Sequence, residues 1–200
     1  MDLPLLTSYA RLYKEHGHLL YAIGGTSRDA LLGKAPSDFD FVTDATPEES
    51  LAFIPDADLS FAKYGSIKTK SNGVEVDITT FREEGDYLDF RHPSYVRFVS
   101  SPEKDSVRRD FTINALYLDE QGNVLDFHGG LADLKSKTIR FIGDPVKRIR
   151  EDPLRILRAE RFARRLGFQI DPLSQKAMDE NRFLLEKLNP EKVKSEQKKG

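Results

Sequence analysis

A buried strand that runs into paired glycines and then into a helix is the feature that most constrains the fold of this chain. The apolar run Leu19–Ile23 predicts the strand, Gly24-Gly25 ends it, and the helical pattern of residues 26–32 stops at Gly33. Such a junction presents backbone N–H groups and the positive end of a helix dipole at one place, which suits phosphate groups. The sequence therefore predicts a phosphate-binding turn at the paired glycines.

Two aspartates follow this turn closely. Asp38 and Asp40 lie two residues apart in a predicted strand, so both carboxylates are expected on the same face. Hard divalent cations prefer oxygen ligands, and Mg²⁺ held by two carboxylates can also take substrate phosphates. A pair of this kind is common on protein surfaces, and its position after the phosphate-binding turn is what favours phosphoryl or nucleotidyl transfer.

The composition excludes several classes of protein. The chain has 200 residues, of which 38% are hydrophobic and 32% charged, with a formal net charge of -2, as expected for a globular domain with the start of a second. The absence of cysteine excludes disulfides, zinc–thiolate sites and thiol nucleophiles. Because no apolar run approaches membrane-spanning length and no signal-peptide pattern opens the chain, we expect a cytoplasmic protein with no membrane partner.

Local patterns predict both helices and strands. Helices are expected over residues 3–15, after a capping box at Thr46, Pro47 and Glu49, and beyond residue 145, where Gly167 ends an amphipathic segment. Strand-like runs over residues 66–70 and 73–80 meet at Asn72-Gly73, which predicts a hairpin. Residues 82–95 show no clear period and predict a loop, whereas the apolar stretch 111–118 fits either a helix or a strand.

Asp77 lies in the second strand of that hairpin. It shares a face with Glu75 and Thr79, and a third carboxylate beside a pair is a common way to complete a two-metal site. An ordinary solvent-facing residue explains the pattern equally well, so the spacing alone leaves both interpretations open.

Two polar groups downstream fit a nucleotide. Arg109 and Asp110, with Asn114, offer a phosphate-binding fork and partners for ribose hydroxyls, although an Arg-Arg-Asp run is more often a surface ion-pair patch. Asp152, Arg155 and Arg158 recur every third residue on a predicted helix. The adjacent acceptor and donor of the first two could bind the edge of a base, and an ordinary salt bridge between them is the alternative. The segment 140–165 carries nine Lys and Arg residues against four Asp and Glu, which fits either a polyanion or a solvated helix face.

Taken together and in this order, the motifs resemble the class II (bacterial-type) tRNA nucleotidyltransferases, or CCA-adding enzymes, of the poly(A) polymerase family. The resemblance extends over residues 19–170. It rests on Gly24-Gly25-x-x-Arg28-Asp29 with Asp38-x-Asp40, on Asp105-x-x-Arg108-Arg109-Asp110 with Asn114, on Asp126-x-x-Gly129-Gly130 with Asp133, and on Glu151-Asp152-x-x-Arg155.

The resemblance implies the roles of these residues. Asp38 and Asp40 would hold two Mg²⁺ ions that activate the RNA 3′-hydroxyl and steady the triphosphate, and the resemblance leaves the role of Asp77 open. Phosphate contacts are implied for Gly24, Gly25, Arg28 and Arg158, ribose recognition for Arg109, Asp110 and Asn114, and selection of CTP and then ATP for Asp152 and Arg155. The implied partners are CTP, ATP and the 3′ end of tRNA, and no protein partner is expected.

The implied fold is α+β. A nucleotidyltransferase head with a small mixed, mostly antiparallel sheet and helices would occupy residues 1–143, and a helical neck would begin in residues 144–200, without the body and tail of longer relatives. A poly(A) polymerase or A-adding enzyme shares this head, and Lys63–Lys68 resembles the CCA-adding branch more closely. A truncated nucleotide-binding module with little RNA turnover is the other alternative.

Overall fold

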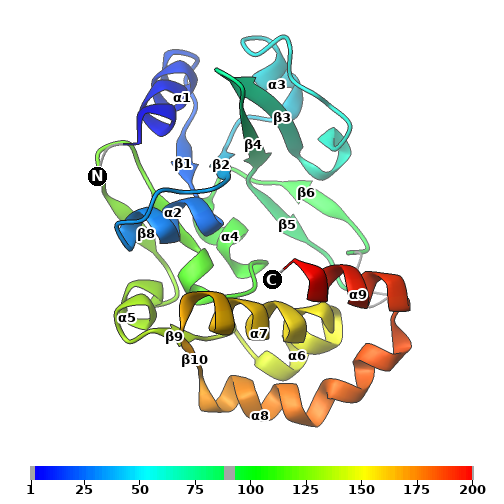
Figure 1. Ribbon diagram of the computed structural model, residues 1–200. Coiled ribbons are helices and arrows are strands. Elements are labelled where there is room, and N and C mark those ends of the chain that lie inside the picture. The colour runs from blue at the N-terminus through cyan, green and yellow to red at the C-terminus, as the bar shows by residue number, and fades with distance from the viewer. Residues whose placement is uncertain (1–2, 88–92, 200) are drawn as a thin grey trace. The chain divides into compact units, whose positions relative to one another are not determined.

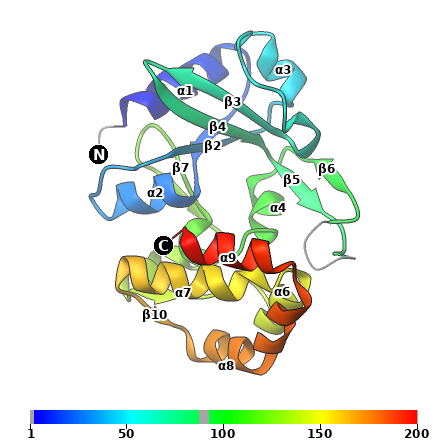
Figure 2. The same ribbon diagram turned by 45° about the vertical axis from the view of Figure 1, so that its right-hand side comes forward.

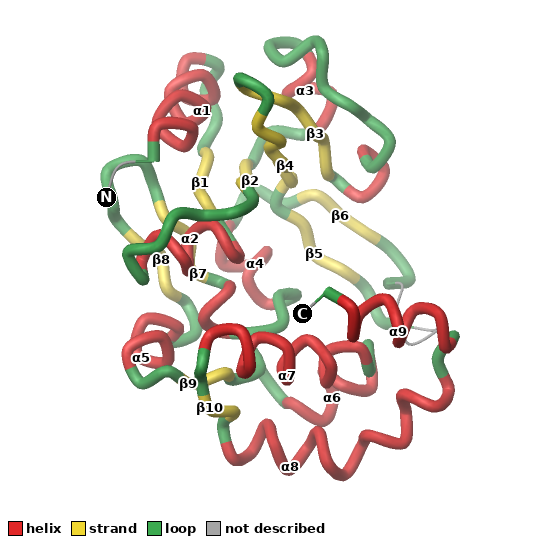
Figure 3. The backbone as a smooth tube through the Cα atoms, viewed as in Figure 1, coloured by secondary structure: helices red, strands yellow, loops and turns green. Residues whose placement is uncertain are grey.

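The computed structural model describes residues 3–87 and 93–199, and a six-stranded sheet forms its first part (Figures 1 and 3). The strand order is β3-β4-β2-β1-β7-β8. The strands are β1 (Leu20–Ala22), β2 (Phe39–Thr43), β3 (Ser66–Ser71), β4 (Val74–Thr80), β7 (Leu116–Leu118) and β8 (Val124–Asp126). Only β2 and β4 pair in parallel within this sheet, so the expected mixed, mostly antiparallel sheet is confirmed.

Both faces of this sheet are covered by apolar side chains. Helix α1 (Pro4–Glu15) lies along one face, where Leu6 and Tyr13 pack in one cluster with Phe41 of β2 (Figure 2). The next residue of β2, Val42, points to the opposite face and packs with Phe81 and Tyr117. This alternation is the normal consequence of the two-residue period of a strand, and it fixes which face each β2 side chain occupies.

The remaining helices around this sheet are short. They are α2 (Gly24–Leu31), α3 (Pro47–Leu51), the 3₁₀ turn η1 (Ala62–Tyr64), α4 (Pro102–Val107) and the 3₁₀ turn η2 (Thr112–Asn114). The predicted capping box of α3 is present, because Thr46 Oγ1 accepts from the Glu49 N–H at 3.2 Å and the Glu49 carboxylate accepts from the Thr46 N–H at 2.8 Å. The hairpin turn is also confirmed, with Asn72 and Gly73 at φ of 51° and 82°.

Contacts between Cα atoms divide the chain into two compact units. Unit 1 comprises residues 1–83, 96–108 and 114–127, and unit 2 comprises residues 84–95, 109–113 and 128–200. Unit 2 contains α5 (Gly130–Lys135), β9 (Thr138–Ile139), α6 (Pro145–Glu151), α7 (Leu154–Leu166), β10 (Gln169–Ile170), α8 (Pro172–Asn181), η3 (Arg182–Lys187) and α9 (Pro190–Lys198). The helical character expected beyond residue 145 is therefore confirmed, while the functional division into residues 1–143 and 144–200 stays a prediction.

Unit 2 has its own hydrophobic core. Phe111 is fully buried, and its ring centroid lies 4.9 Å from that of Phe141 and 5.7 Å from that of Phe162. The backbone on either side of Phe111 hydrogen-bonds to the chain beside β9, with the Thr112 N–H donating to the Arg140 carbonyl at 3.0 Å. Helix α7 ends at Gly167 with φ of 68°, the left-handed cap that the sequence predicts.

One expectation from the sequence is wrong. Residues 82–84 form strand β5 (Arg82–Glu84), which pairs with β6 (Val96–Phe98) in a two-stranded sheet, where the sequence predicts a loop over residues 82–95. Strands of three residues are too short to display a period, so their pairing is decided by tertiary contacts. The part of the predicted loop at residues 88–92 lies outside the described residues. No helix among the described residues is both long and apolar enough to span a membrane.

Candidate functional site

The turn between β1 and α2 brings the paired glycines next to the first predicted metal ligands. Asp40 lies in β2, Asp38 directly precedes that strand, and the Ile23 N–H donates to the Asp40 carbonyl at 3.0 Å. Gly24 adopts φ of +65°, and a Cβ atom placed on it would lie 3.7 Å from Asp40 Oδ2. The Asp40 carboxylate therefore lies against the first residue of α2, where backbone N–H groups and the helix dipole favour negative charge.

Arg28 and Asn114 meet in the same unit. The Arg28 side chain is buried, its Nε donates to Asp29 Oδ1 at 2.8 Å and its Nη1 donates to Asn114 Oδ1 at 2.8 Å. A Cβ atom on Gly25 would lie 3.6 Å from Arg28 Nη2. The guanidinium is therefore folded over the start of its own helix, next to the glycine turn. The resemblance implies phosphate contacts for Arg28 and ribose contacts for Asn114, and the side chains of these two residues, 86 positions apart, are hydrogen-bonded to each other.

Asp77 is the neighbour of Asp40 on the adjacent parallel strand. The register pairs Asp40 with Asp77, and on the other side of β4 it pairs Asp77 with Lys68. Lys68 Nζ lies 3.2 Å from Asp77 Oδ1, and the hydrogen bond to this carboxylate raises the pKa of the Lys68 ammonium. In this structure Asp77 is thus the counter-ion of a lysine, and it lies between the Asp40 carboxylate on one neighbouring strand and the Lys68 ammonium on the other.

The carboxylates of Asp38 and Asp40 are the type of ligand that a magnesium ion prefers. Asp38 is exposed and Asp40 is half-buried, so both can be reached from solvent. Within residues 3–87 and 93–199, no three His, Asp or Glu side chains gather closely enough to hold a metal ion by themselves. Mg²⁺ is commonly bound by one or two carboxylates with water and substrate phosphates as its other ligands, so Asp38 and Asp40 would suffice as its protein ligands.

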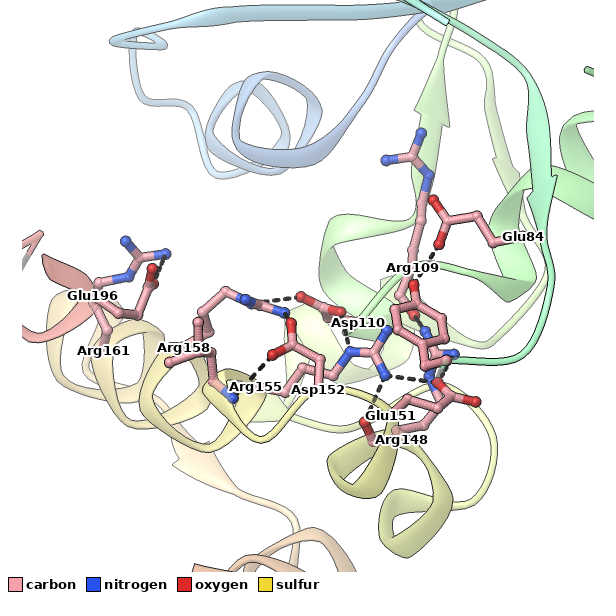
Figure 4. Close-up of polar contacts among 12 residues, drawn as sticks. Glu84, Arg109, Asp110, Arg148, Glu151, Asp152, Arg155, Arg158, Arg161 and Glu196 are labelled. Carbon is pink, nitrogen blue, oxygen red and sulfur yellow. Dashed lines mark hydrogen bonds and ion pairs between the residues drawn. The ribbon is translucent and has the colours of Figure 1, made fainter. Parts of the chain in front are cut away.

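A separate ionic cluster occupies unit 2 and is centred on Asp110 (Figure 4). Arg155 Nε donates to Asp110 Oδ1 at 2.7 Å, and Arg158 Nε donates to Asp110 Oδ2 at 2.8 Å. The Arg155 side chain is 3% exposed and that of Asp110 is 23% exposed. Burial by itself would raise the pKa of the Asp110 carboxyl, but the charges of Arg158 and Arg155 and their hydrogen bonds hold it well below its usual range.

Asp152 has two roles at the start of α7. Its Oδ1 accepts from the Leu154 N–H at 3.1 Å, and its Oδ2 accepts from Arg158 Nη2 at 2.8 Å (Figure 4). The ion pair considered from the sequence, between Asp152 and Arg155, is replaced by a pair between Asp152 and Arg158 six residues further on. Burial would lower the pKa of the Arg158 guanidinium, but Asp110 and Asp152 together raise it.

Arg148 and Glu151 complete this cluster, and the sequence analysis assigned them no role. Glu151 Oε2 accepts from Arg155 Nη1 at 2.7 Å and from Arg148 Nη1 at 2.6 Å. Arg148 Nη2 donates to the backbone carbonyl of Arg109 at 2.9 Å. The spacing of Arg148, Glu151 and Arg155 by three and four residues was the available signal, because such spacing brings charges together on a helical chain.

The predicted ribose-binding residues are divided between the two units. Arg109 and Asp110 belong to unit 2, where they contact Arg148, Arg155 and Arg158, and Asn114 belongs to unit 1, where it contacts Arg28. The aromatic ring of Tyr87 lies 5.6 Å from the Arg155 guanidinium, a cation–π distance. The nearby residues Asp89, Arg91 and His92 lie outside the described part of the chain.

Comparisons with known proteins agree with the resemblance. Residues 20–140 match the family model of the Poly A polymerase head domain. The CCA-adding enzyme of Bacillus licheniformis is 43% identical over 95% of this chain and 47% of its own length. The crystal structure of the Bacillus stearothermophilus CCA-adding enzyme in complex with CTP is similar with a TM-score of 0.88 and 35% identity, over 98% of this chain and 48% of that one.

A third similar protein carries RNA. It is a tRNA nucleotidyltransferase complexed with a primer tRNA and an incoming ATP analog, with a TM-score of 0.74 and 34% identity over 94% of this chain and 54% of that one. The chain thus spans about half the length of the relatives it matches. Because the family model matches more than half of the residues and the paired glycines and Asp38-x-Asp40 lie inside the match, the chain belongs to the family of the Poly A polymerase head domain.

Proposed function

We propose that this chain carries the catalytic head of a template-independent tRNA nucleotidyltransferase, which transfers CMP and AMP from CTP and ATP to the 3′ end of tRNA. The observation that carries the proposal is the position of the Asp40 carboxylate beside the start of α2, where a Cβ atom added to Gly24 would lie 3.7 Å from Asp40 Oδ2. This geometry would join a candidate metal ligand to a phosphate-binding turn, as in-line transfer of a nucleotidyl group requires. The CTP and ATP complexes of similar proteins support the choice of substrates.

In this proposal Asp38 and Asp40 would hold Mg²⁺, which would supply charge neutralisation at the triphosphate and lower the pKa of the attacking 3′-hydroxyl. The hydroxyl oxygen would form a bond to the α-phosphorus and release its proton to solvent, while the bond to the bridging oxygen of the departing pyrophosphate breaks. Asp77 is a third candidate ligand, and it would have to exchange its contact with Lys68 for the metal.

We also propose roles in nucleotide binding for the remaining candidate residues. Gly24, Gly25 and Arg28 would contact the triphosphate, with Arg158, and Arg109, Asp110 and Asn114 would contact the ribose. Asp152 and Arg155 would form hydrogen bonds with the edge of the base. The Asp110 cluster supports this assignment, because it fixes the orientation of the two arginines before any nucleotide arrives.

Two alternatives belong to the same family. A poly(A) polymerase or A-adding enzyme is favoured by the name of the matching family model. A nucleotide-binding module with little RNA turnover is the other alternative. We also propose a head in residues 1–143, a neck that begins in residues 144–200, and a cytoplasmic location.

Primer extension separates these functions. Labelled CTP and ATP are offered singly to tRNA that lacks CCA and to tRNA that ends in CC, with the double variant Asp38→Asn/Asp40→Asn as the control. CMP addition to the first substrate and AMP addition to the second, both lost in the double variant, is the expected result. AMP addition to both substrates identifies an A-adding enzyme, and Mg²⁺-dependent binding of both nucleotides without extension identifies the binding module.

A further inference from the structure

The Thr26 hydroxyl sits between the backbones of the two candidate metal ligands. Thr26 is the third residue of α2 and is 1% exposed. Its Oγ1 donates to the Asp38 carbonyl at 2.9 Å and accepts from the Asp40 N–H at 2.8 Å. One hydroxyl has one proton to donate and two lone pairs to accept with, so this arrangement uses the proton and one lone pair.

These two hydrogen bonds lie just beyond the end of the backbone pairing between β1 and β2. The pairing of β1 with β2 ends at Ala22 and Phe41, so no β1 residue faces Asp38 or Asp40. The Ile23 N–H adds one more backbone hydrogen bond by donating to the Asp40 carbonyl. Along the same edge of β2, the Thr26 hydroxyl then bonds the Asp40 N–H and the Asp38 carbonyl. A helix side chain therefore replaces a strand backbone at the two residues that carry the carboxylates.

We propose that Thr26 is the positioning residue for Asp38 and Asp40, holding the start of β2 against the first turn of α2 so that both carboxylates face one cation. The inference rests on the proposed function, in which those carboxylates bind Mg²⁺. A carboxylate pair on a fixed backbone loses little freedom on binding a metal, whereas one at a frayed strand end must first be ordered.

The test compares three variants in the binding of Mn²⁺ alone, titrated by electron paramagnetic resonance. Thr26→Val keeps the shape and removes the hydroxyl, and it is expected to weaken Mn²⁺ binding about tenfold, as loss of a group supporting a metal ligand does. Thr26→Ser keeps the hydroxyl and is expected to bind within about twofold of the unmodified chain. Ser27→Ala is the matched control, since this buried neighbour bonds within the helix, to the Gly24 carbonyl at 3.4 Å.

A second readout is independent of any metal. The amide of Asp40 is expected to exchange its proton slowly in the unmodified chain and in Thr26→Ser, and about tenfold faster in Thr26→Val, because the acceptor of its hydrogen bond is gone. If Thr26→Val does not fold, Thr26→Ala replaces it in both measurements.

The outcomes separate the two proposals. Unchanged Mn²⁺ affinity in the hydroxyl-free variant, with a site that Asp38→Asn/Asp40→Asn abolishes, overturns the role of Thr26 and leaves the metal site standing. If the unmodified chain binds no Mn²⁺, the metal proposal is wrong and the exchange of the Asp40 amide alone decides: unaltered exchange overturns the positioning role, and accelerated exchange supports it.

Discussion

Two arginines of α7 donate hydrogen bonds to Asp110. The contribution of the Asp110 charge to the free energy of unfolding can be measured. Asp110→Asn keeps the shape but leaves Arg155 and Arg158 facing a neutral amide. Because hydrogen bonds to charged groups contribute about 1.5–3 kcal/mol each and the Asp110 side chain is partly exposed, we expect a loss of about 2 kcal/mol in the free energy of unfolding at pH 7. Urea unfolding measures it, and Asp179→Asn on the exposed side of α8 is the control, expected to change stability by less than about 0.5 kcal/mol.

The same carboxylate predicts a dependence on pH. The folded state lowers the pKa of Asp110, so the stabilisation is fully present above the ordinary carboxyl pKa of about 3.9 and is lost as the pH falls through the lower folded value. The unmodified chain should therefore lose its advantage over Asp110→Asn in urea unfolding below about pH 4. A constant difference between the two proteins from pH 7 down to pH 3 would contradict this origin of the stabilisation.

Base selection is the other test at the scale of single residues. Asp152→Ala and Arg155→Ala should each reduce the preference for CTP and ATP over UTP and GTP about tenfold, because a bidentate contact to a base contributes about 1–3 kcal/mol of discrimination. Arg164→Ala, at an exposed position of the same helix, is the matched control. Binding of the four nucleotides is measured by calorimetry, and unaltered ratios of the four affinities in both variants would exclude base reading by this pair.

At the scale of elements, the capping box makes α3 a sensitive local test. Thr46→Ala removes the acceptor of the Glu49 N–H, and loss of such a cap costs about 1 kcal/mol, which corresponds to a melting temperature lower by about 2–4 °C in a chain of this size. Glu48→Ala changes an exposed residue of the same turn that takes no part in the cap, and it should shift the melting temperature by less than about 1 °C. Equal shifts in both variants would mean that the cap does not stabilise the helix.

The elements that the sequence predicts well depend on near neighbours. The paired glycines at the start of α2, the capping box at Thr46 and the hairpin at Asn72-Gly73 follow from backbone conformations set within a few residues. Contacts between residues far apart in the sequence could not be predicted in this way. Arg155 and Arg158, for example, bind Asp110 across 45 and 48 residues.

Spacing alone pointed to the wrong helical partner of Asp152. The i,i+3 spacing favours Arg155, whereas the structure pairs Asp152 with Arg158 because Asp110 and Glu151 bind Arg155. The role of Thr26 could not be predicted for a related reason. A threonine within a helical pattern does not indicate a partner, and its partners are known only once the start of β2 is seen beside it.

At the scale of the whole molecule, the two compact units are interleaved in the chain. Residues 109–113 belong to unit 2 although residues on both sides of them belong to unit 1. This segment supplies the buried ring of Phe111 and accepts, through the Asp110 carbonyl, a hydrogen bond from the Ile142 N–H at 3.0 Å. The C-terminal part of the chain is therefore incomplete without a piece of the N-terminal part.

Fragments test this interleaving. Residues 128–200 alone lack Phe111, and removal of a fully buried phenylalanine from a core costs about 3–5 kcal/mol, which is most of the stability of a small domain. We expect this fragment to show no cooperative transition in thermal denaturation followed by circular dichroism. The longer fragment 109–200 restores the segment and should regain a cooperative transition below that of the intact chain, because it still lacks residues 84–95. Cooperative melting of 128–200 at the same temperature as 109–200 would show that the inserted segment contributes nothing to the stability of unit 2.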